Sequence, residues 1–280
     1  MIGAIIGDMV GSIYEFHNIK TKDFPLFSEG CGYTDDTLMT VAVARALQAA
    51  GDGEALIAAL VREMRVTAAR YPISPLLGGY GRAFHKWLVK GRYVAIPKPY
   101  NSFGNGSAMR VSPCAEYADT LEQALRLAEV SAAVSHNHPE GIKGAQATAA
   151  AVWMAGHGAS KAEIGDYIRQ HYYPLTGTVD ALRPVYKMDG SCQGTVPPAI
   201  LCFLESASFE DALRNAISLG GDSDTLADIA CAIAWPYYAR QGMDDTMHSL
   251  REKALSKLPP ALRSFVGDWE NTYGIYGGAQ

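Results

Sequence analysis

Cysteine is scarce in this chain and basic charge is in deficit, and both shortages exclude classes of protein. The five cysteines, at positions 31, 114, 192, 202 and 231, are odd in number and form no CxxC pair. A disulfide framework or a zinc cluster is therefore not expected, and a reducing cytoplasm is the default compartment. The 24 basic residues against 29 acidic ones give a net charge of −5. We expect no nonspecific binding to nucleic acid or to anionic membranes, because both require a basic face.

Long apolar runs and alternating strand patterns are also missing. No apolar run approaches the roughly 20 residues that a membrane span needs. The first residues lack a basic segment and reach Asp8 too early for a signal peptide, which again favours a cytoplasmic protein. We find no internal repeat, low-complexity tract or clear linker. With 48% hydrophobic residues available for a core, the sequence predicts an all-α fold with one compact domain over residues 1–280.

Helical periodicity locates the expected elements. Apolar residues recur at helical spacing between stretches that contain glycine and proline. Residues 18–33, 91–113 and 172–195 are expected to be irregular. Beyond an N-terminal helix, we expect helices over residues 37–50, 54–70, 83–90, 121–134, 142–155, 162–171, 196–204, 209–219, 225–238, 247–258 and 261–273.

Three glycines near the N-terminus share one face of the first expected helix. Gly3, Gly7 and Gly11 follow one another at four-residue spacing. Each glycine inside a helix costs about 1 kcal/mol relative to alanine, so three on one face predict that another backbone packs closely there. The same step reaches Glu15, which places a carboxylate where this face ends. Spacing alone slightly favours a solvated glutamate at the helix end.

Two short acidic stretches, TDDT at 34–37 and DSDT at 222–225, each precede an apolar, alanine-rich helix. Thr and Asp suit helix N-caps, since their oxygens accept the unpaired backbone N–H groups and the helix dipole favours negative charge. If the two stretches face each other, four carboxylates share one small space. Their mutual repulsion would raise the pKa values unless a cation lay between them. Oxygen-only ligands suit Mg²⁺, Mn²⁺ or Ca²⁺ rather than Zn²⁺.

Taken alone, the acidic stretches admit three interpretations. Each could be a helix cap with exposed carboxylates. A calcium site is the second interpretation, although residues 222–226 lack the third ligand and the glycine of an EF-hand loop. A two-metal hydrolase is the third, because paired metals can orient a diol or activate water for the hydrolysis of phosphate or glycosidic linkages.

Residues 101–110, NSFGNGSAMR, contain glycines that let backbone N–H groups converge on an anion. This stretch is neither a P-loop nor a Rossmann fingerprint, and a plain turn is an equal alternative.

His136 and His138 could be metal ligands, could contact a ligand phosphate, or could close a turn. Cys192 has no recognisable base pattern nearby, so we expect a bystander and not a nucleophile.

Five motifs, in this order along the chain, resemble the ADP-ribosylglycohydrolase family. They are GDxxGSxxE at 7–15, TDDT at 34–37, SxGNGxxMR at 102–110, SH at 135–136 and GGDSDT at 220–225. This family includes the dinitrogenase reductase-activating glycohydrolases and the ADP-ribosylarginine and ADP-ribosylserine hydrolases. The resemblance extends from residue 3 to about residue 235, and five motifs in order make it specific.

The resemblance implies an all-α domain with a centre of two Mg²⁺ ions, or Mn²⁺, at the bottom of an ADP-ribose cleft. Glu15 and Asp36 would be the catalytic carboxylates, and residues 78–81 would border the cleft. The implied metal ligands are Thr34, Asp35, Asp36, Asp222, Asp224 and Thr225. The implied substrate-binding residues are Ser102, Phe103, Gly104, Asn105, Gly106 and His136.

The implied activity is hydrolysis of the glycosidic bond between ADP-ribose and an arginine or serine side chain, or a small conjugate. The partner would then be an ADP-ribosylated protein or a small ADP-ribosyl compound. Residues 102–104, SFG, are more similar to serine-type loops than to arginine-type ones. The alternatives are a Mg²⁺-dependent nucleotide phosphohydrolase and a non-catalytic ADP-ribose-binding or structural protein. The sequence predicts neither the oligomeric state nor which carboxylate acts as acid or base.

Overall fold

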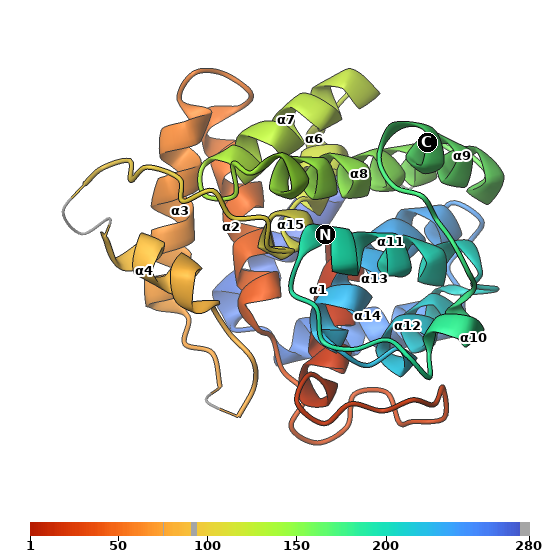
Figure 1. Cartoon of the computed structure of the whole chain (residues 1–280). Coiled ribbons are helices and arrows are strands. Elements are labelled where there is room, and N and C mark those ends of the chain that lie inside the picture. Colours follow the sequence, from red (N-terminus) through yellow and green to blue (C-terminus); the bar gives the residue numbers. More distant parts are fainter. Residues whose placement is uncertain (75, 91–93, 275–280) are drawn as a thin grey trace.

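The computed structural model describes residues 1–74, 76–90 and 94–274, and in these ranges the regular elements are helices (Figure 1). An isolated β-bridge joins Gly104 to Ser191. The elements are α1 (Ile2–Gly11), η1 (Ser12–Tyr14), α2 (Asp35–Ala50), α3 (Leu56–Arg70), α4 (Arg82–Lys90), α5 (Gly106–Met109), α6 (Ser112–Tyr117), α7 (Leu121–Ala133), α8 (Pro139–Gly156), α9 (Lys161–His171), α10 (Val179–Leu182), α11 (Cys192–Leu204), α12 (Phe209–Ser218), α13 (Ser223–Ala239), α14 (Asp245–Lys257) and α15 (Pro260–Tyr273).

Two buried helices, α1 and α13, form the centre of the molecule. Every residue of α1 is buried, as are all residues of α13 from Ser223 to Pro236. The predicted close approach at the glycine face is confirmed. A Cβ on Gly3 or Gly7 would lie 2.2 Å from a carbonyl oxygen of α13, and one on Gly11 would lie 2.6 Å from the Asp224 Cα. Because only glycine fits, the end of α1 is fixed beside the start of α13.

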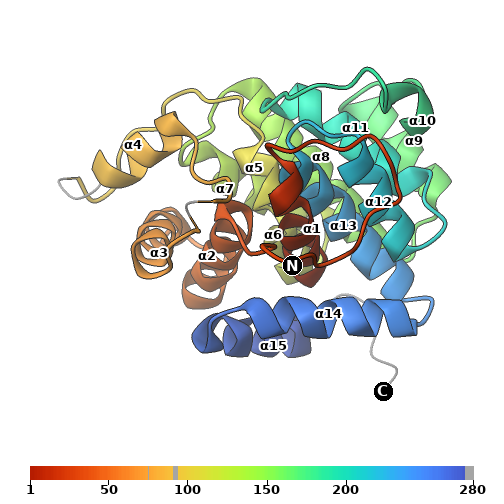
Figure 2. The same cartoon turned by 90° about the horizontal axis from the view of Figure 1, so that it is seen from below.

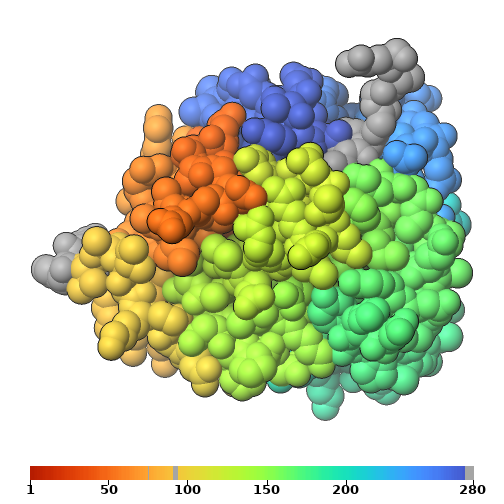
Figure 3. All heavy atoms as spheres, turned by 90° about the horizontal axis from the view of Figure 1, so that it is seen from above, coloured from red at the N-terminus to blue at the C-terminus, as the bar shows by residue number. Residues whose placement is uncertain are grey.

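The remaining helices surround this pair and confirm the predicted all-α class. Helix α2 packs against α3, while α8, α11 and α12 pack against α13. Helices α14 and α15 lie side by side along one edge (Figure 2). On the face seen in Figure 3, the yellow-green middle of the chain lies beside the orange α2–α3 region and below the blue C-terminal helices. None of the described helices is both long and apolar enough to span a membrane.

The structure corrects two stretches that we expected to be irregular. Helices α5 and α6 lie wholly or partly in residues 91–113, and α10 lies in residues 172–195. These helices are four to six residues long, which is too short to display a 3.6-residue period. Helix α11 also begins earlier than predicted, because the Ser191 side chain caps it by accepting from the Gly194 N–H. Most longer helices agree with the prediction to within two residues.

Candidate active site

A cleft of about 350 Å³ opens where α2 and α13 begin. Its floor is acidic, and its walls come from loop 102–106, the start of α4 and the turn before α8. The cleft brings together every predicted site residue except Thr34 and Phe103. It is lined by Glu15, Asp35, Asp36, Gly79, Gly81, Arg82, Ala83, Phe84, Tyr100, Ser102, Gly104, Asn105, Gly106, Met109, Arg110, His136, Gly190, Asp222, Asp224 and Thr225.

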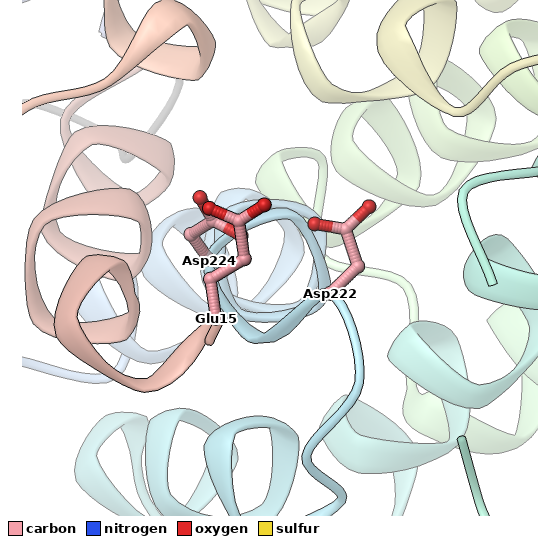
Figure 4. Close-up of side chains that lie close together, drawn as sticks. All are labelled: Glu15, Asp222 and Asp224. Carbon is pink, nitrogen blue, oxygen red and sulfur yellow. The ribbon is translucent and has the colours of Figure 1, made fainter. Parts of the chain in front are cut away.

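Three carboxylates from two distant parts of the chain meet on the floor. Glu15, Asp222 and Asp224 each offer an oxygen, and these atoms lie within 4.8 Å of one another. Figure 4 shows the carboxylates of Glu15 and Asp224 next to each other, with that of Asp222 across the start of α13 from them. The packing of α1 on α13 explains this arrangement, since Glu15 directly follows η1. A solvated glutamate at a helix end, the alternative that spacing favoured, is therefore wrong.

The start of α2 is held by Asp8, a residue for which no role was predicted. Asp8, fully buried on α1, accepts from the Thr34 N–H at 3.0 Å and the Thr34 hydroxyl at 2.8 Å. It also accepts from the Thr37 N–H at 3.1 Å and from the Thr37 hydroxyl. Burial raises the pKa of Asp8, while these hydrogen bonds lower it. The only signal in the sequence was the place of Asp8 in the first motif.

Thr34 occupies the predicted N-cap of α2, and its side chain accepts from the Asp36 N–H at 3.2 Å. Its hydroxyl is thus already bonded to Asp8 and to the helix, and it does not line the cleft. Its role as a metal ligand stays a prediction.

The carboxylates of α2 face those of α13, and their pKa values are raised, as the sequence predicted for carboxylates that share one small space. Burial and the Asp8 charge raise the pKa of Asp35 to about 8. Burial, followed by the charge of Asp224, raises the pKa of Asp36 well above its ordinary range. Burial, followed by the charge of Asp222, raises the pKa of Asp224 in the same way. Burial and the Asp222 charge raise the pKa of Glu15 to about 7.

Two of these carboxylates carry buried oxygens that no described residue satisfies. Asp36 Oδ2 and Glu15 Oε2 are shielded from solvent and have no hydrogen-bond partner in the described part of the chain. A buried carboxylate oxygen without a partner is costly unless a proton or a cation neutralises it. Oxygen donors, several negative charges and unsatisfied lone pairs together fit a hard divalent cation.

Asp222 departs from the expected cap geometry. It occupies the N-cap position of α13, but its side chain makes no capping hydrogen bond. Its Oδ2 instead accepts from Asn105 Nδ2 at 2.7 Å, and the same amide donates to Thr195 Oγ1 at 3.1 Å. The Asn105 amide therefore connects the glycine-rich loop to the acidic floor, whereas the family resemblance implied a contact with the substrate alone.

The loop before α13 is fixed by glycine geometry and by Asn18. Gly220 and Gly221 have φ values of 66° and 73°, which glycine adopts readily. Asn18 Nδ2 donates to the carbonyl oxygens of Glu15, at 2.9 Å, and Gly221, at 2.9 Å. Asn18 Oδ1 accepts from the Gly221 N–H at 2.7 Å. Asn18, unnoticed in the sequence, thus joins the segment that carries Glu15 to the loop that carries Asp222.

The wall opposite the acidic floor contains loop 102–106 and His136. Ser102 Oγ accepts from the Gly104 N–H at 3.1 Å. Phe103 points outward, with 48% of its surface exposed, and its ring lies 5.4 Å from that of His138. His138 caps α8 by accepting from the Glu140 N–H, so among its three alternatives it closes a turn.

Cys192 is confirmed as a bystander. Its thiol lies buried and donates to the Gly104 carbonyl oxygen at 3.2 Å. Burial raises the pKa of Cys192 to about 12, so little thiolate exists near neutral pH.

Comparison with known proteins places this geometry in a family. The ADP-ribosylglycohydrolase family model matches residues 1–258. The Homo sapiens ADP-ribosylhydrolase ARH3 is 29% identical over 90% of this chain and 87% of its own length. The ADP-ribosylarginine hydrolase Tri1 of Pseudomonas putida (strain GB-1) is 26% identical over 87% of this chain and 70% of its own length.

Two further comparisons agree over nearly the whole chain. The ADP-ribosyl-(dinitrogen reductase) glycohydrolase of Rhodospirillum rubrum is 26% identical over 95% of this chain and 92% of its own length. A solved structure described as an ADP-ribosylglycohydrolase-related protein complex shares the fold, with a TM-score of 0.70 and 20% identity over 99% of this chain and 97% of that chain. Because the family model spans most of the sequence, and the five motifs meet at one cleft, the chain belongs to the ADP-ribosylglycohydrolase family.

Proposed function

We propose that this protein is a Mg²⁺-dependent hydrolase that cleaves the glycosidic bond between ADP-ribose and a protein side chain or small conjugate. The observation that carries the proposal is the cleft itself, in which buried acidic groups of α2 and α13 face a glycine-rich loop and a histidine. The relatives are named as an ADP-ribosylhydrolase, an ADP-ribosylarginine hydrolase and an ADP-ribosyl-(dinitrogen reductase) glycohydrolase, and these names support the same reaction class.

The unsatisfied oxygens of the floor support a metal centre. Two Mg²⁺ ions, or Mn²⁺, would be held by Asp35, Asp36, Asp222, Asp224 and Thr225, with Thr34 as a further candidate. When bound, these ions would supply positive charge that orients a ribose diol and lowers the pKa of water.

The protein's own groups would perform the proton transfers and stabilise charge. Glu15 is the first candidate for the general acid–base group: without metal its pKa is raised to about 7, and bound cations would lower it again. Asp36, in the first turn of α2, also lines the cleft and is the second candidate base. The other carboxylates would stabilise the positive charge that develops on the ribose as its bond to the side chain breaks.

The cleft favours a serine linkage over an arginine linkage. The exposed neighbour of Ser102 is the aromatic Phe103, which offers no carboxylate for a guanidinium. Arg82 lines the cleft, where its positive charge would repel that of an arginine acceptor. We therefore propose ADP-ribosylserine as the preferred substrate class.

The decisive experiment offers serine-linked and arginine-linked ADP-ribosylated proteins to the enzyme, with Mg²⁺ and with chelator. We expect free ADP-ribose in the presence of Mg²⁺ only, with the serine-linked substrate consumed faster. A parallel phosphate assay identifies the competing nucleotide phosphohydrolase, which would release phosphate instead. Calorimetric binding of ADP-ribose with no hydrolysis of either substrate would refute catalysis and favour the non-catalytic alternative.

A further inference from the structure

A chain of three side chains leads from the protein interior to the cleft. Arg110 is fully buried, and its Nη2 lies 2.7 Å from the Ser131 carbonyl oxygen and 3.0 Å from Ser135 Oγ. Ser135 Oγ lies 2.8 Å from His136 Nδ1. Ser135 is also fully buried, so neither hydrogen bond competes with bulk water. The far nitrogen of the ring, His136 Nε2, faces loop 102–106.

The direction of each hydrogen bond in this chain follows from chemistry. A guanidinium has donors only, so Arg110 must donate to Ser135 Oγ. A serine hydroxyl has one proton, and the structure gives Ser135 Oγ only two side-chain partners among the described residues. If His136 Nδ1 also donated to Ser135, the buried serine proton would have no acceptor, which costs about 1–3 kcal/mol. Ser135 therefore donates to Nδ1.

We infer that Arg110 and Ser135 are positioning residues that place the single ring proton of His136 on Nε2, so that the histidine is a hydrogen-bond donor to an acceptor atom of the substrate. This inference rests on the proposed function for the identity of that substrate. An oxygen of the ADP-ribose diphosphate is the acceptor that a donor in this wall would meet.

The surroundings of the ring support a neutral, fixed donor. Burial, and then the Arg110 charge, lowers the pKa of His136 well below its ordinary range, which keeps the ring neutral. The rings of Phe84 and Tyr100 flank the imidazole, with centroids 6.0 Å and 5.7 Å from its own.

Space for a ligand atom lies directly beside the donor. A Cβ on Gly106 would lie 3.3 Å from His136 Nε2, and one on Gly104 would lie 3.5 Å away. The absence of these side chains leaves the N–H open to the cleft. An acceptor oxygen of the ligand can therefore approach the ring edge that the relay through Ser135 has protonated.

The first test is the nitrogen NMR spectrum of the imidazole in the ligand-free protein. Long-range ¹H–¹⁵N correlations distinguish a ring protonated at Nε2 from one protonated at Nδ1. We expect the Nε2–H pattern, with the Nδ1 resonance shifted by an accepted hydrogen bond. The Nδ1–H pattern would overturn the inference. This readout needs neither turnover nor ADP-ribose, so it is independent of whether the proposed function is correct.

The second test compares Ser135→Ala, Ser135→Thr and the control Ser131→Ala. In Ser135→Ala we expect the Nδ1 resonance to move and an Nδ1–H population to appear, with ADP-ribose binding about tenfold weaker. Ser135→Thr keeps the hydroxyl and should restore both properties. Ser131→Ala removes a neighbouring buried hydroxyl while keeping the carbonyl that Arg110 uses.

An unchanged spectrum in Ser135→Ala would overturn the inference. Because Arg110 is fully buried, its replacement risks unfolding the protein, so the test of the inference uses the serine variants alone.

Discussion

Asp224 is the residue on which most of the acidic floor depends. It shares the carboxylate cluster with Glu15 and Asp222, and its charge also raises the pKa of Asp36. We expect Asp224→Ala to weaken Mg²⁺ binding and to lower kcat/KM by about 100-fold or more, since even residues that only support a metal ligand contribute 10–100-fold. Calorimetric Mg²⁺ titration and ADP-ribose release measure the two effects. Asp268→Ala, an exposed aspartate on α15, is the control. Full activity in Asp224→Ala would refute the proposed centre.

Gly78 controls the orientation of Glu15. A Cβ at Gly78 would lie 1.7 Å from Glu15 Oε2, so Gly78→Ala must push that carboxylate aside. The atom that moves is the end of a flexible side chain, and we therefore expect little change in stability. A catalytic group displaced by about 1 Å can cost about 100-fold in rate, so kcat should fall 10–100-fold.

The matched control for Gly78→Ala is Gly53→Ala, because a Cβ at Gly53 meets nothing within 4 Å. Steady-state kinetics and thermal unfolding of both variants separate the two effects. Equal activity of Gly78→Ala and wild type would show that the position of Glu15 in this structure is unimportant for turnover.

At the scale of elements, the cleft exists because two helix N-termini are brought together by a third helix. Asp8 of α1 binds the first turn of α2, and the glycine face of α1 lies against α13. Both helix dipoles point their positive ends at the floor, which partly compensates its concentrated negative charge. Packing and site geometry are therefore inseparable in this part of the fold.

Gly7 tests this dependence. A Cβ at Gly7 would lie 2.2 Å from the Ala227 carbonyl oxygen, which belongs to a backbone that cannot rotate away. We expect Gly7→Ala to lower the free energy of unfolding by about 3 kcal/mol, at the upper end of overpacking effects, and to weaken Mg²⁺ binding as α1 and α13 separate. Urea denaturation measures the first effect, and metal titration the second.

Gly267→Ala is the comparison for Gly7→Ala. Gly267 also lies in a helix, α15, but a Cβ there meets nothing within 4 Å. Alanine is the better helix former by about 1 kcal/mol, so this variant should be as stable as wild type or more stable. Destabilisation of both variants to the same degree would indicate a general glycine effect and not the α1–α13 contact.

For the whole molecule, sequence periodicity was sufficient for the long helices and insufficient for their arrangement. Residues 37–50 and 225–238 were predicted as helices because apolar spacing repeats over several turns, and α2 and α13 contain them. The four-residue helix α5 had no such signal, since its burial against α8 decides its conformation.

The candidate site divides in the same way. Asp36 and Asp224 could be predicted from the sequence, because paired aspartates at the start of a helix are a residue type and position that suit a cation. Residues that act through contacts could not. Asn18 bonds to Gly221, 203 residues away, and Asp8 bonds to Thr34, 26 residues away. Nothing local in the sequence distinguishes Asn18 from a surface asparagine, and Asp8 is marked only by its place in the first motif.

The acidic centre should also set how the stability of the whole protein responds to pH. In the metal-free fold, the pKa of Glu15 is raised from 4.5 to about 7 and that of Asp35 from 3.8 to about 8. Between the ordinary and the raised pKa of each group, the folded protein holds more protons than the unfolded chain. The stability that these two groups contribute is therefore complete below about pH 4 and is lost as the pH rises through 7 to 8.

Mg²⁺ must displace the same protons, so its affinity should rise over that pH window. We expect the increase in Tm caused by Mg²⁺, relative to chelator, to be small near pH 6 and several-fold larger near pH 8, because bound metal replaces the lost protons as the source of neutralising charge. Thermal unfolding at three pH values, with Mg²⁺ and with chelator, measures this difference. Asp224→Ala should abolish it at every pH. A Tm increase of equal size at all three values would mean that the floor carboxyls are already ionised in the metal-free protein, and that no proton exchange accompanies metal binding.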